Sequence, residues 1–249
     1  MIAAFWRDAR HAVRALGHQP GFTLIALLSL ALGLGLNTAI FSLVNAVLLR
    51  PLPVDRPREL VAIFTSADSG DPYSSSSYPD YADLAADHAT LAGVAAHTLM
   101  FVGVDQGDAT RMFVGEIVSA NYFSLLGVPL VAGRGFAPGD DRPGTAPTVV
   151  ISSKMWRRDF GGDPGAVGRP LQIRGRPYTI VGIAPQSFGG LASGVSAELW
   201  VPVGCVEDVE PVGMIDSTPS PGSNRVERRG QRWLFLTGRL NPGAALAQA

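Results

Sequence analysis

The sequence predicts one membrane-spanning helix followed by a domain that mixes strands with short helices. Two observations predict this arrangement. Between Ala15 and Leu49 the chain has no Asp, Glu, Lys or Arg, and from Phe22 onward this stretch is almost wholly apolar. After Arg50, short apolar-periodic segments alternate with turns rich in Gly and Pro, as in a folded water-exposed domain.

The membrane helix is predicted over residues 21–50. As a helix, the apolar run from Phe22 to Leu49 would be roughly 40 Å long, more than the roughly 30 Å hydrocarbon core of a bilayer requires. One alternative is a cleaved signal peptide, although the apolar core of such a peptide is typically about 7–15 residues. The other is a buried core helix, which rarely exceeds about 20 residues without a charge.

Residues 1–20 are predicted to form an amphipathic helix in the plane of the membrane interface. Aromatic and aliphatic side chains share one face of residues 4–16, and arginines share the other. In such a helix the aromatic side chains enter the lipid and the arginines reach phosphate groups. Gly17 and Pro20 should end it. The alternative is a helix on another protein's surface. The expected interfacial anchors are Trp6, Arg7, Arg10 and Arg14.

Inside the membrane helix, small residues recur every fourth position at Ala31, Gly35 and Ala39. This spacing forms a stripe on which a second membrane helix could pack closely. Asn37 is polar at mid-depth and needs a hydrogen-bond partner there. We therefore expect other transmembrane helices as partners, besides membrane lipid. The alternative is that the small residues simply face lipid.

Period-2 and period-3.6 patterns and their turn signals divide the remaining chain into elements. The expected strands are Leu60–Thr65, Leu99–Val104, Thr110–Val118, Thr148–Ser152, Leu171–Arg174, Tyr178–Ile183, Glu198–Val203 and Arg232–Leu240. The expected helices are Pro79–Leu91, Ala120–Leu126 capped by Ser119, Lys154–Phe160 capped by Ser153, and one opening at Asn241-Pro242. Trp156 and Phe160 should pack on the Leu171–Ile183 hairpin.

Motifs for enzyme chemistry are missing from the sequence. The only lysine, Lys154, follows a serine, so no GxxxxGK[ST] phosphate loop exists, and neither GxSxG nor HExxH occurs. Asp80, Asp83 and Asp87 fit a solvated helix face better than a metal site. Cys205 is alone and is expected to be buried. With a net charge of −1, the chain shows no basic footprint for nucleic acid. We predict no catalytic, cofactor-binding or metal-binding residues.

Four segments together resemble a known family. GFTLIALLSLALGLGLNTAIFSLVNAVLLRPLP (Gly21–Pro53) is similar to the first transmembrane helix of MacB/FtsX-type ABC transporter permeases, closest to the acidobacterial duplicated permease branch. VSANYFSLLGVPLVAGRGF (Val118–Phe136) and MWRRDFGGDPGAVGRPLQIRGRPYTIVGIAP (Met155–Pro185) resemble their periplasmic core domain. WLFLTGRLNPGAALAQA (Trp233–Ala249) resembles the strand and helix that re-enter its membrane-proximal half.

The resemblance implies an α+β extracytoplasmic domain over residues 51–249, with a porter-like part and a β-rich distal part. It implies a bacterial inner-membrane protein whose amino terminus is cytoplasmic and whose domain is periplasmic. It also implies mechanotransmission, in which a separate ABC ATPase moves the outer domain during export. Charge alone does not fix the orientation, because Arg7, Arg10 and Arg14 precede the helix while Arg50, Arg56 and Arg58 follow it.

The family pattern continues beyond Ala249, so the resemblance implies an amino-terminal fragment of a permease with a core domain truncated at its C-terminus. We then expect one sheet edge and part of an apolar face, along Leu234, Leu236 and Leu240, to lie open. Two other readings stay open. One is a stand-alone membrane-anchored binding or adaptor domain, and the other is an anchored hydrolase, for which no nucleophile–base set is present.

Overall fold

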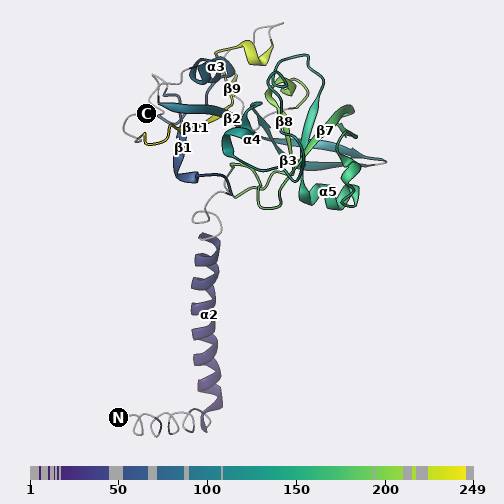
Figure 1. Ribbon diagram of the computed structural model, residues 1–249. Helices are drawn as coiled ribbons and strands as arrows, with labels where there is room; N and C mark the ends of the chain where they lie inside the picture. The colour runs from purple at the N-terminus through teal and green to yellow at the C-terminus, as the bar shows by residue number, and fades with distance from the viewer. Residues whose placement is uncertain are drawn as a thin grey trace. The chain divides into compact units, whose positions relative to one another are not determined.

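The computed structural model of this chain describes residues 6, 11, 14, 16, 18–44, 53–66, 72–86, 90–107, 109–192, 194–209, 215–216 and 224–244. The chain divides into two compact units, Met1–Arg50 and Pro51–Ala249 (Figure 1). Each unit is described by itself below.

The first unit contains one long helix, α2 (Pro20–Val44), of 25 residues. Its Pro20–Ser42 stretch has a mean hydropathy of 2.1, and none of its most apolar window is buried by protein. At about 1.5 Å per residue α2 is long enough to cross a bilayer. The predicted break before α2 is present, because Gln19 is not helical and Pro20 opens the helix, where a proline loses no hydrogen bond.

The second unit is a sheet with short helices. Its strands are β1 (Leu60–Ile63), β2 (Leu91–Gln106), β3 (Ala109–Val118), β4 (Ala132–Gly133), β5 (Thr148–Ser152), β6 (Pro170–Ile173), β7 (Arg176–Ala184), β8 (Leu199–Pro202), β9 (Ile215–Asp216), β10 (Gln231–Arg232) and β11 (Phe235–Leu240). Its α-helices are α3 (Tyr78–Ala86), α4 (Tyr122–Leu126) and α5 (Ser153–Phe160). The short 3₁₀ helices are η2 (Pro57–Glu59), η3 (Pro164–Ala166), η4 (Val203–Cys205) and η5 (Arg225–Glu227).

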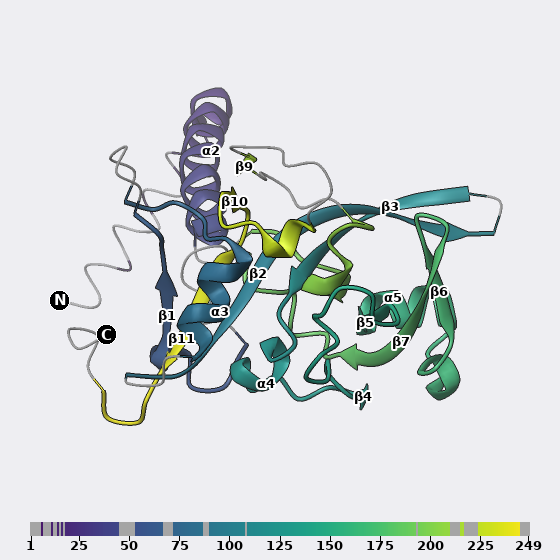
Figure 2. The ribbon, with the colours of Figure 1, turned by 90° about the horizontal axis from the view of Figure 1, so that it is seen from above.

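The main sheet has nine strands and follows the order β1-β11-β2-β3-β8-β5-β7-β4. Strand β6 lies off this path and pairs with both β2 and β7. The strands β2, β3, β8, β5, β7 and β6 therefore close into a ring. We call this part the ring half, and β1, β11, α3, α4 and the start of β2 the layered half. Figure 2 shows the two halves at opposite ends of the sheet.

The ring half is filled by alternating side chains of its strands. On β2, Met100, Val102 and Val104 are at most 1% exposed, and Val104 is paired with Ile173 of β6. Strands that line a closed core bury every second side chain, as this pattern requires. The other buried ring residues include Phe113, Val149, Ile151, Leu171, Tyr178, Ile180, Ile183, Leu199 and Val201.

The β6–β7 hairpin turns through Arg174 and Gly175, which both have positive φ angles of 50° and 77°. Two successive left-handed residues are the geometry of a tight hairpin turn, and they explain why glycine follows arginine here. The sequence predicted this hairpin correctly. Trp156 and Phe160 are half-buried and pack against the core to which this hairpin contributes. Their direct contact with the hairpin stays a prediction.

The layered half places α3 and α4 against β2. Strand β11 lies between β1 and β2, antiparallel to both. A second core lies under α4 and the 185–197 loop and contains a cluster of aromatic rings. Its largest members are Tyr122, Phe123, Phe136, Phe188 and Trp200.

Several predicted element ends are wrong by a few residues. The helix predicted over Pro79–Leu91 ends at Ala86 within the described residues, and Leu91 begins β2. The cap of α5 is Ser152, whose hydroxyl accepts from Met155 N, rather than Ser153, which donates to Ala184 O. Of the predicted terminal helix, residues 241–244 form a turn, and the remainder lies outside the described residues.

Other details of the caps and the sheet edge also differ. Asn121 rather than Ser119 precedes α4, and Ser119 Oγ accepts from Ala96 N. Leu234, Leu236 and Leu240 are buried, so the expected open apolar face along them is wrong. Strand β11 is paired on both sides, and the free edge falls on β1 instead. The predicted mixture of helices and strands is confirmed.

Candidate functional site

The four residues predicted to pack on other membrane helices all lie on α2 and are exposed in this chain. They are Ala31, Gly35, Asn37 and Ala39. Ala31, Gly35 and Ala39 follow one another at about 40° around the helix, so they form one stripe. A Cβ at Gly35 would meet no other atom within 4 Å. Asn37 is two residues from Gly35, about 200° around the axis, and therefore faces away from the stripe. Contacts with other membrane helices, if made through both features, would occupy two sides of α2.

The predicted interfacial anchors are only partly described. Trp6 is helical and 70% exposed, and Arg14 is helical and exposed. Arg7 and Arg10 lie outside the described residues. An exposed indole and an exposed guanidinium at helical positions suit an interfacial location, which stays a prediction.

A buried arginine ties the segment that enters the second unit to the sheet. Arg239 of β11 has a side chain that is only 8% exposed. Its guanidinium donates to Asp55 O and Leu125 O at 2.8 Å each, and to Arg56 O at 3.4 Å. It also pairs with Glu59 at 3.3 Å. We call Asp55, Arg56, Glu59, Leu125 and Arg239 the Arg239 clamp.

The backbone around the clamp is tightly fitted. Asp55 N donates to Leu126 O at 2.9 Å. A Cβ at Gly127, which has φ +65°, would come within 2.4 Å of Asp55 Cβ. Arg56 itself has a left-handed φ of 42°, which an L-residue adopts at a cost. The entering segment is thus fixed to both β11 and α4.

A second charged side chain is buried between β3 and the loop that precedes β8. Glu116 is fully buried. Its carboxylate accepts from Tyr122 Oη at 2.7 Å, Trp200 Nε1 at 2.9 Å and the Leu191 and Ala192 amides at 3.1 and 3.3 Å. Burial raises the pKa of Glu116, and these donors partly offset the rise. Glu116 therefore joins the loop to β3 through two hydrogen bonds, and joins α4 and β8 to the same site through the other two.

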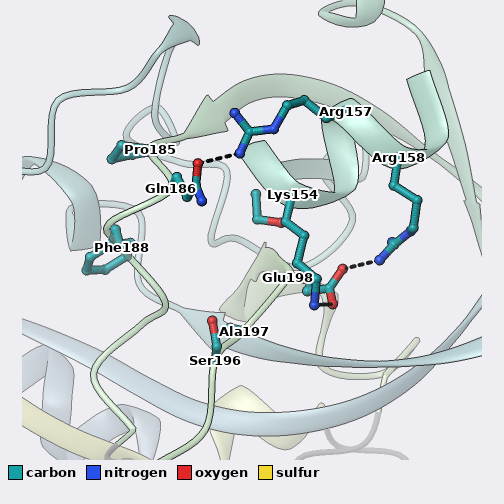
Figure 3. Close-up of a pocket in the computed structure, with 10 residues that line it drawn as sticks. Lys154, Arg157, Arg158, Pro185, Gln186, Phe188, Ser196, Ala197 and Glu198 are labelled. Atoms are coloured by element: carbon teal, nitrogen blue, oxygen red, sulfur yellow. Dashed lines mark hydrogen bonds and ion pairs between the residues drawn. The ribbon is translucent and has the colours of Figure 1, made fainter. Parts of the chain in front are cut away.

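A pocket of about 480 Å³ lies beside α5 (Figure 3). Helix α5 contributes Lys154, Arg157 and Arg158, and the segments on either side of the 185–197 loop contribute Gln186 and Glu198. The remaining lining residues are Ser152, Pro185, Phe188, Ser196 and Ala197. We call it the basic pocket. The helical spacing of three and four residues places Lys154, Arg157 and Arg158 on one side of α5.

Ion pairs organise the basic pocket. Glu198 accepts from Lys154 Nζ and Arg158 Nη1 at 2.8 Å each. Although burial opposes it, these two cations lower the pKa of Glu198. Arg158 also forms a bidentate pair with Asp159. Arg157 Nη2 instead donates to the neutral amide oxygen of Gln186 at 2.6 Å.

No assembled catalytic set is found among the described residues. They contain no cluster of three or more His, Cys, Asp or Glu side chains that could hold a metal ion. Asp80 and Asp83 pair with Arg229. Burial lowers the pKa of His97 to about 4 and raises the pKa of the Cys205 thiol to about 11. A neutral imidazole and a protonated thiol in these positions serve packing rather than nucleophilic chemistry.

Sequence reasoning missed Glu116 and Arg239, because a charged residue in a strand is expected on the solvent face. The signal was available for Arg239. It stands beside Leu240 in a strand whose other residues are mostly apolar, and all residues from Leu236 to Leu240 are buried. For Glu116, no local pattern shows that Tyr122 and Trp200 meet it.

The fold and the apolar helix define the class of this protein, an α+β domain that follows a candidate membrane helix in the sequence. The model of the MacB-like periplasmic core domain family matches residues 23–249. The chain belongs to this family, as the resemblance of its four segments implied.

Curated relatives match over a shorter region. A probable export ATP-binding/permease protein of Pseudomonas fluorescens (strain Pf0-1) is 32% identical over 85 residues, and the MacB protein of Pseudomonas entomophila (strain L48) is 29% identical over 85 residues. Each alignment covers 34% of this chain and 13% of the relative. The match thus spans only a small part of the relatives' length.

Solved structures confirm the fold. The periplasmic region of MacB from Actinobacillus actinomycetemcomitans superposes with a TM-score of 0.53 and 13% identity, covering 78% of this chain and 82% of that one. A domain of a putative permease protein from Porphyromonas gingivalis gives a TM-score of 0.51 and 18% identity, covering 71% and 73%. The α+β prediction is therefore correct.

Proposed function

We propose that this chain is part of an export permease of the mechanotransmission type. In this proposal a separate ABC ATPase moves the membrane helix, and the helix moves the domain of residues 51–249. The family match supports a permease component, and the curated relatives are probable export proteins that join an ATP-binding part to a permease. The alignments cover only 13% of each relative. ATPase coupling and export are therefore proposals for this chain.

The observation that carries the proposal is the Arg239 clamp. A domain that is moved through its entering segment needs that segment fixed to its sheet, or the motion is lost in a slack linker. Residues 55–59 are fixed by four hydrogen bonds or ion pairs, three to Arg239 and one to Leu126. The Arg239 guanidinium also donates to Leu125 O and so joins β11 to α4. A displacement of residues 55–59 would therefore be passed to β11 and α4.

The coupling test needs the protein in its native membrane. A photo-crosslinking residue at Trp6 should form an adduct with an ABC ATPase, whereas one at Phe101 of β2 should not. A fluorophore on Phe101→Cys should respond to ATP in the same membranes. In the Arg239→Met background the adduct should persist and the response should fall. An adduct at neither position, with the chain correctly inserted, would contradict the proposal.

Orientation and localisation are part of the same proposal. We place the amino terminus in the cytoplasm and residues 51–249 in the periplasm of an inner membrane, with Ala31, Gly35, Ala39 and Asn37 contacting other helices. The chain should resist extraction by alkaline carbonate. A phosphatase fused after Ala249 should be active, and a fluorescent protein fused there should be dark. The reverse pattern would overturn the orientation, and a soluble product shortened by about 45 residues would indicate a signal peptide.

A further inference from the structure

The basic pocket lies apart from the Arg239 clamp and plays no part in the proposed coupling. We propose that it binds a small amphiphilic anion, with a carboxylate or phosphate head and a compact apolar body. The proposal rests on charge, on unused donors and on the pocket's apolar wall.

The charge balance of the pocket leaves one arginine uncompensated. Three cationic side chains and one carboxylate line the pocket. Lys154 and Arg158 share Glu198, and Arg158 also has Asp159. Within the described residues, Arg157 makes no ion pair, and its side chain donates a hydrogen bond to the neutral Gln186. The position beside Arg157 therefore favours a negative charge.

Arg157 is also geometrically able to bind an oxyanion. A guanidinium carries five N–H donors in a planar fork, and the bond to Gln186 uses one nitrogen, Nη2. The fork matches the two oxygens of a carboxylate or phosphate. Figure 3 shows Arg157 reaching over the pocket from α5 toward Gln186. Gln186 can release Nη2 at little cost, because its own amide can bond to water.

The rest of the pocket suits an apolar body. Pro185, Phe188 and Ala197 line it. Phe188 and Ala197 are each only 2% exposed and form a fixed floor, so the half-buried Pro185 presents the accessible apolar surface of these three. The volume of about 480 Å³ lies within the range of ordinary small-molecule sites. Lys154, with a side chain 71% exposed, stands at the rim as a second cation that can turn toward a bound head group.

The test titrates the full chain in nanodiscs with four probes by calorimetry. The probes are phenyl phosphate, phenylacetate, inorganic phosphate and benzyl alcohol. A ligand of about ten heavy atoms should bind with a Kd between about 10 µM and 1 mM. We expect at least one aromatic anion to bind in this range. Benzyl alcohol and inorganic phosphate should bind at least about tenfold more weakly, because each lacks one of the two features.

Two variants locate the binding. Arg157→Gln should weaken the better anion by about tenfold or more, whereas Arg169→Gln should not change it. Arg169 is a matched control, since it is exposed, pairs with Asp163 and does not line the pocket. Circular dichroism should show that both variants are folded. Preference between the two anions tells whether the natural head group is a phosphate or a carboxylate.

Four results would overturn the proposal. Three are no binding of either aromatic anion, equal binding of benzyl alcohol, and equal weakening by the two variants. Inorganic phosphate binding as tightly as phenyl phosphate would remove the apolar body from the proposal and so also contradict it.

Discussion

The two halves of the domain are held together by different forces. The ring half closes on itself, and its interior is apolar from Met100 to Val201. The layered half has a free edge at β1 and depends on the Arg239 clamp and on hydrogen bonds of Ser119 and Asn121. Burial of apolar area is non-directional, whereas buried hydrogen bonds fix one geometry.

This difference assigns the stability of the domain to the ring half and the transmission of motion from the entering segment to the layered half. A closed ring with no free edge resists local opening, because every strand would have to lose two partners. The layered half receives the segment that follows the membrane helix, and its polar contacts set where that segment sits. We therefore expect substitutions in the ring to lower global stability and substitutions in the clamp to act locally.

The largest effect is expected inside the ring. Ile180→Ala should lower the free energy of unfolding by about 2–5 kcal/mol, because Ile180 is fully buried and leaves a cavity. Thr179→Ala, on the exposed face of the same strand, should change it by less than about 0.5 kcal/mol. Denaturant titration measures both, and equal losses would show that the ring interior is not the main core.

The next effect tests the buried carboxylate of Glu116, which joins β3 of the ring half to α4 of the layered half. Glu116→Gln replaces one acceptor oxygen by an NH₂ group that faces donors, which should cost about 2–3 kcal/mol. Glu227→Gln is the control, because Glu227 is exposed. Tryptophan fluorescence should report the change around Trp200. A loss no greater than that of the control would mean that the four hydrogen bonds contribute little.

The clamp should show a smaller and local effect. Arg239→Met should cost about 2 kcal/mol, because it removes charge-assisted bonds from a buried guanidinium. Hydrogen exchange should accelerate in Leu60–Ile63 and stay slow in Tyr178–Ile183. Arg229→Met, which breaks only surface pairs, should cost at most about 1 kcal/mol. Equal acceleration in Leu60–Ile63 and Tyr178–Ile183 would show that the clamp does not act locally and that the two halves unfold together.

The smallest effect is a pH dependence in the layered half. His97 lies beside Tyr122 and Phe235. Its pKa is about 4 in the folded protein, against the ordinary value of 6.5 in the unfolded chain. The unfolded chain therefore binds a proton that the folded chain does not, and stability falls as pH drops from about 6.5 toward 4. The loss should reach about 1 kcal/mol near pH 5.5.

His97→Phe should flatten this part of the pH profile. The comparison with wild type is needed because burial raises the pKa of Glu116, which gives the opposite slope above its ordinary value. Thermal unfolding of both proteins across pH 7.5 to about 5 measures the difference. Identical profiles would place His97 in contact with water.

The sequence predicted elements well where local signals suffice. Strand β5 is found at its predicted bounds, and Gly127 ends α4 in the left-handed conformation. Errors arose where two neighbours could play the same role. Ser152 and Ser153 can both cap a helix, and only the carbonyl of Ala184, distant in sequence, decides which one does.

Long-range pairing was beyond the reach of sequence patterns. Period and turn signals do not tell that β11 inserts between β1 and β2, or that β6 closes the ring. The same limit explains why the basic pocket was not predicted. Its Lys154 and Glu198 are 44 residues apart, and no local pattern indicates that they meet.

The pairing of β1 with β11 also determines how the domain bears load. Leu60 to Ile63 face Arg239 to Leu236 in antiparallel register, directly after the clamped segment. A pull on that segment along the axis of β1 stresses all of these ladder hydrogen bonds at once, in shear. A pull across the axis would break them one after another, like a zipper. The domain should therefore resist tension along β1 strongly and sideways force weakly. Its mechanical resistance depends on the direction in which the entering segment is pulled.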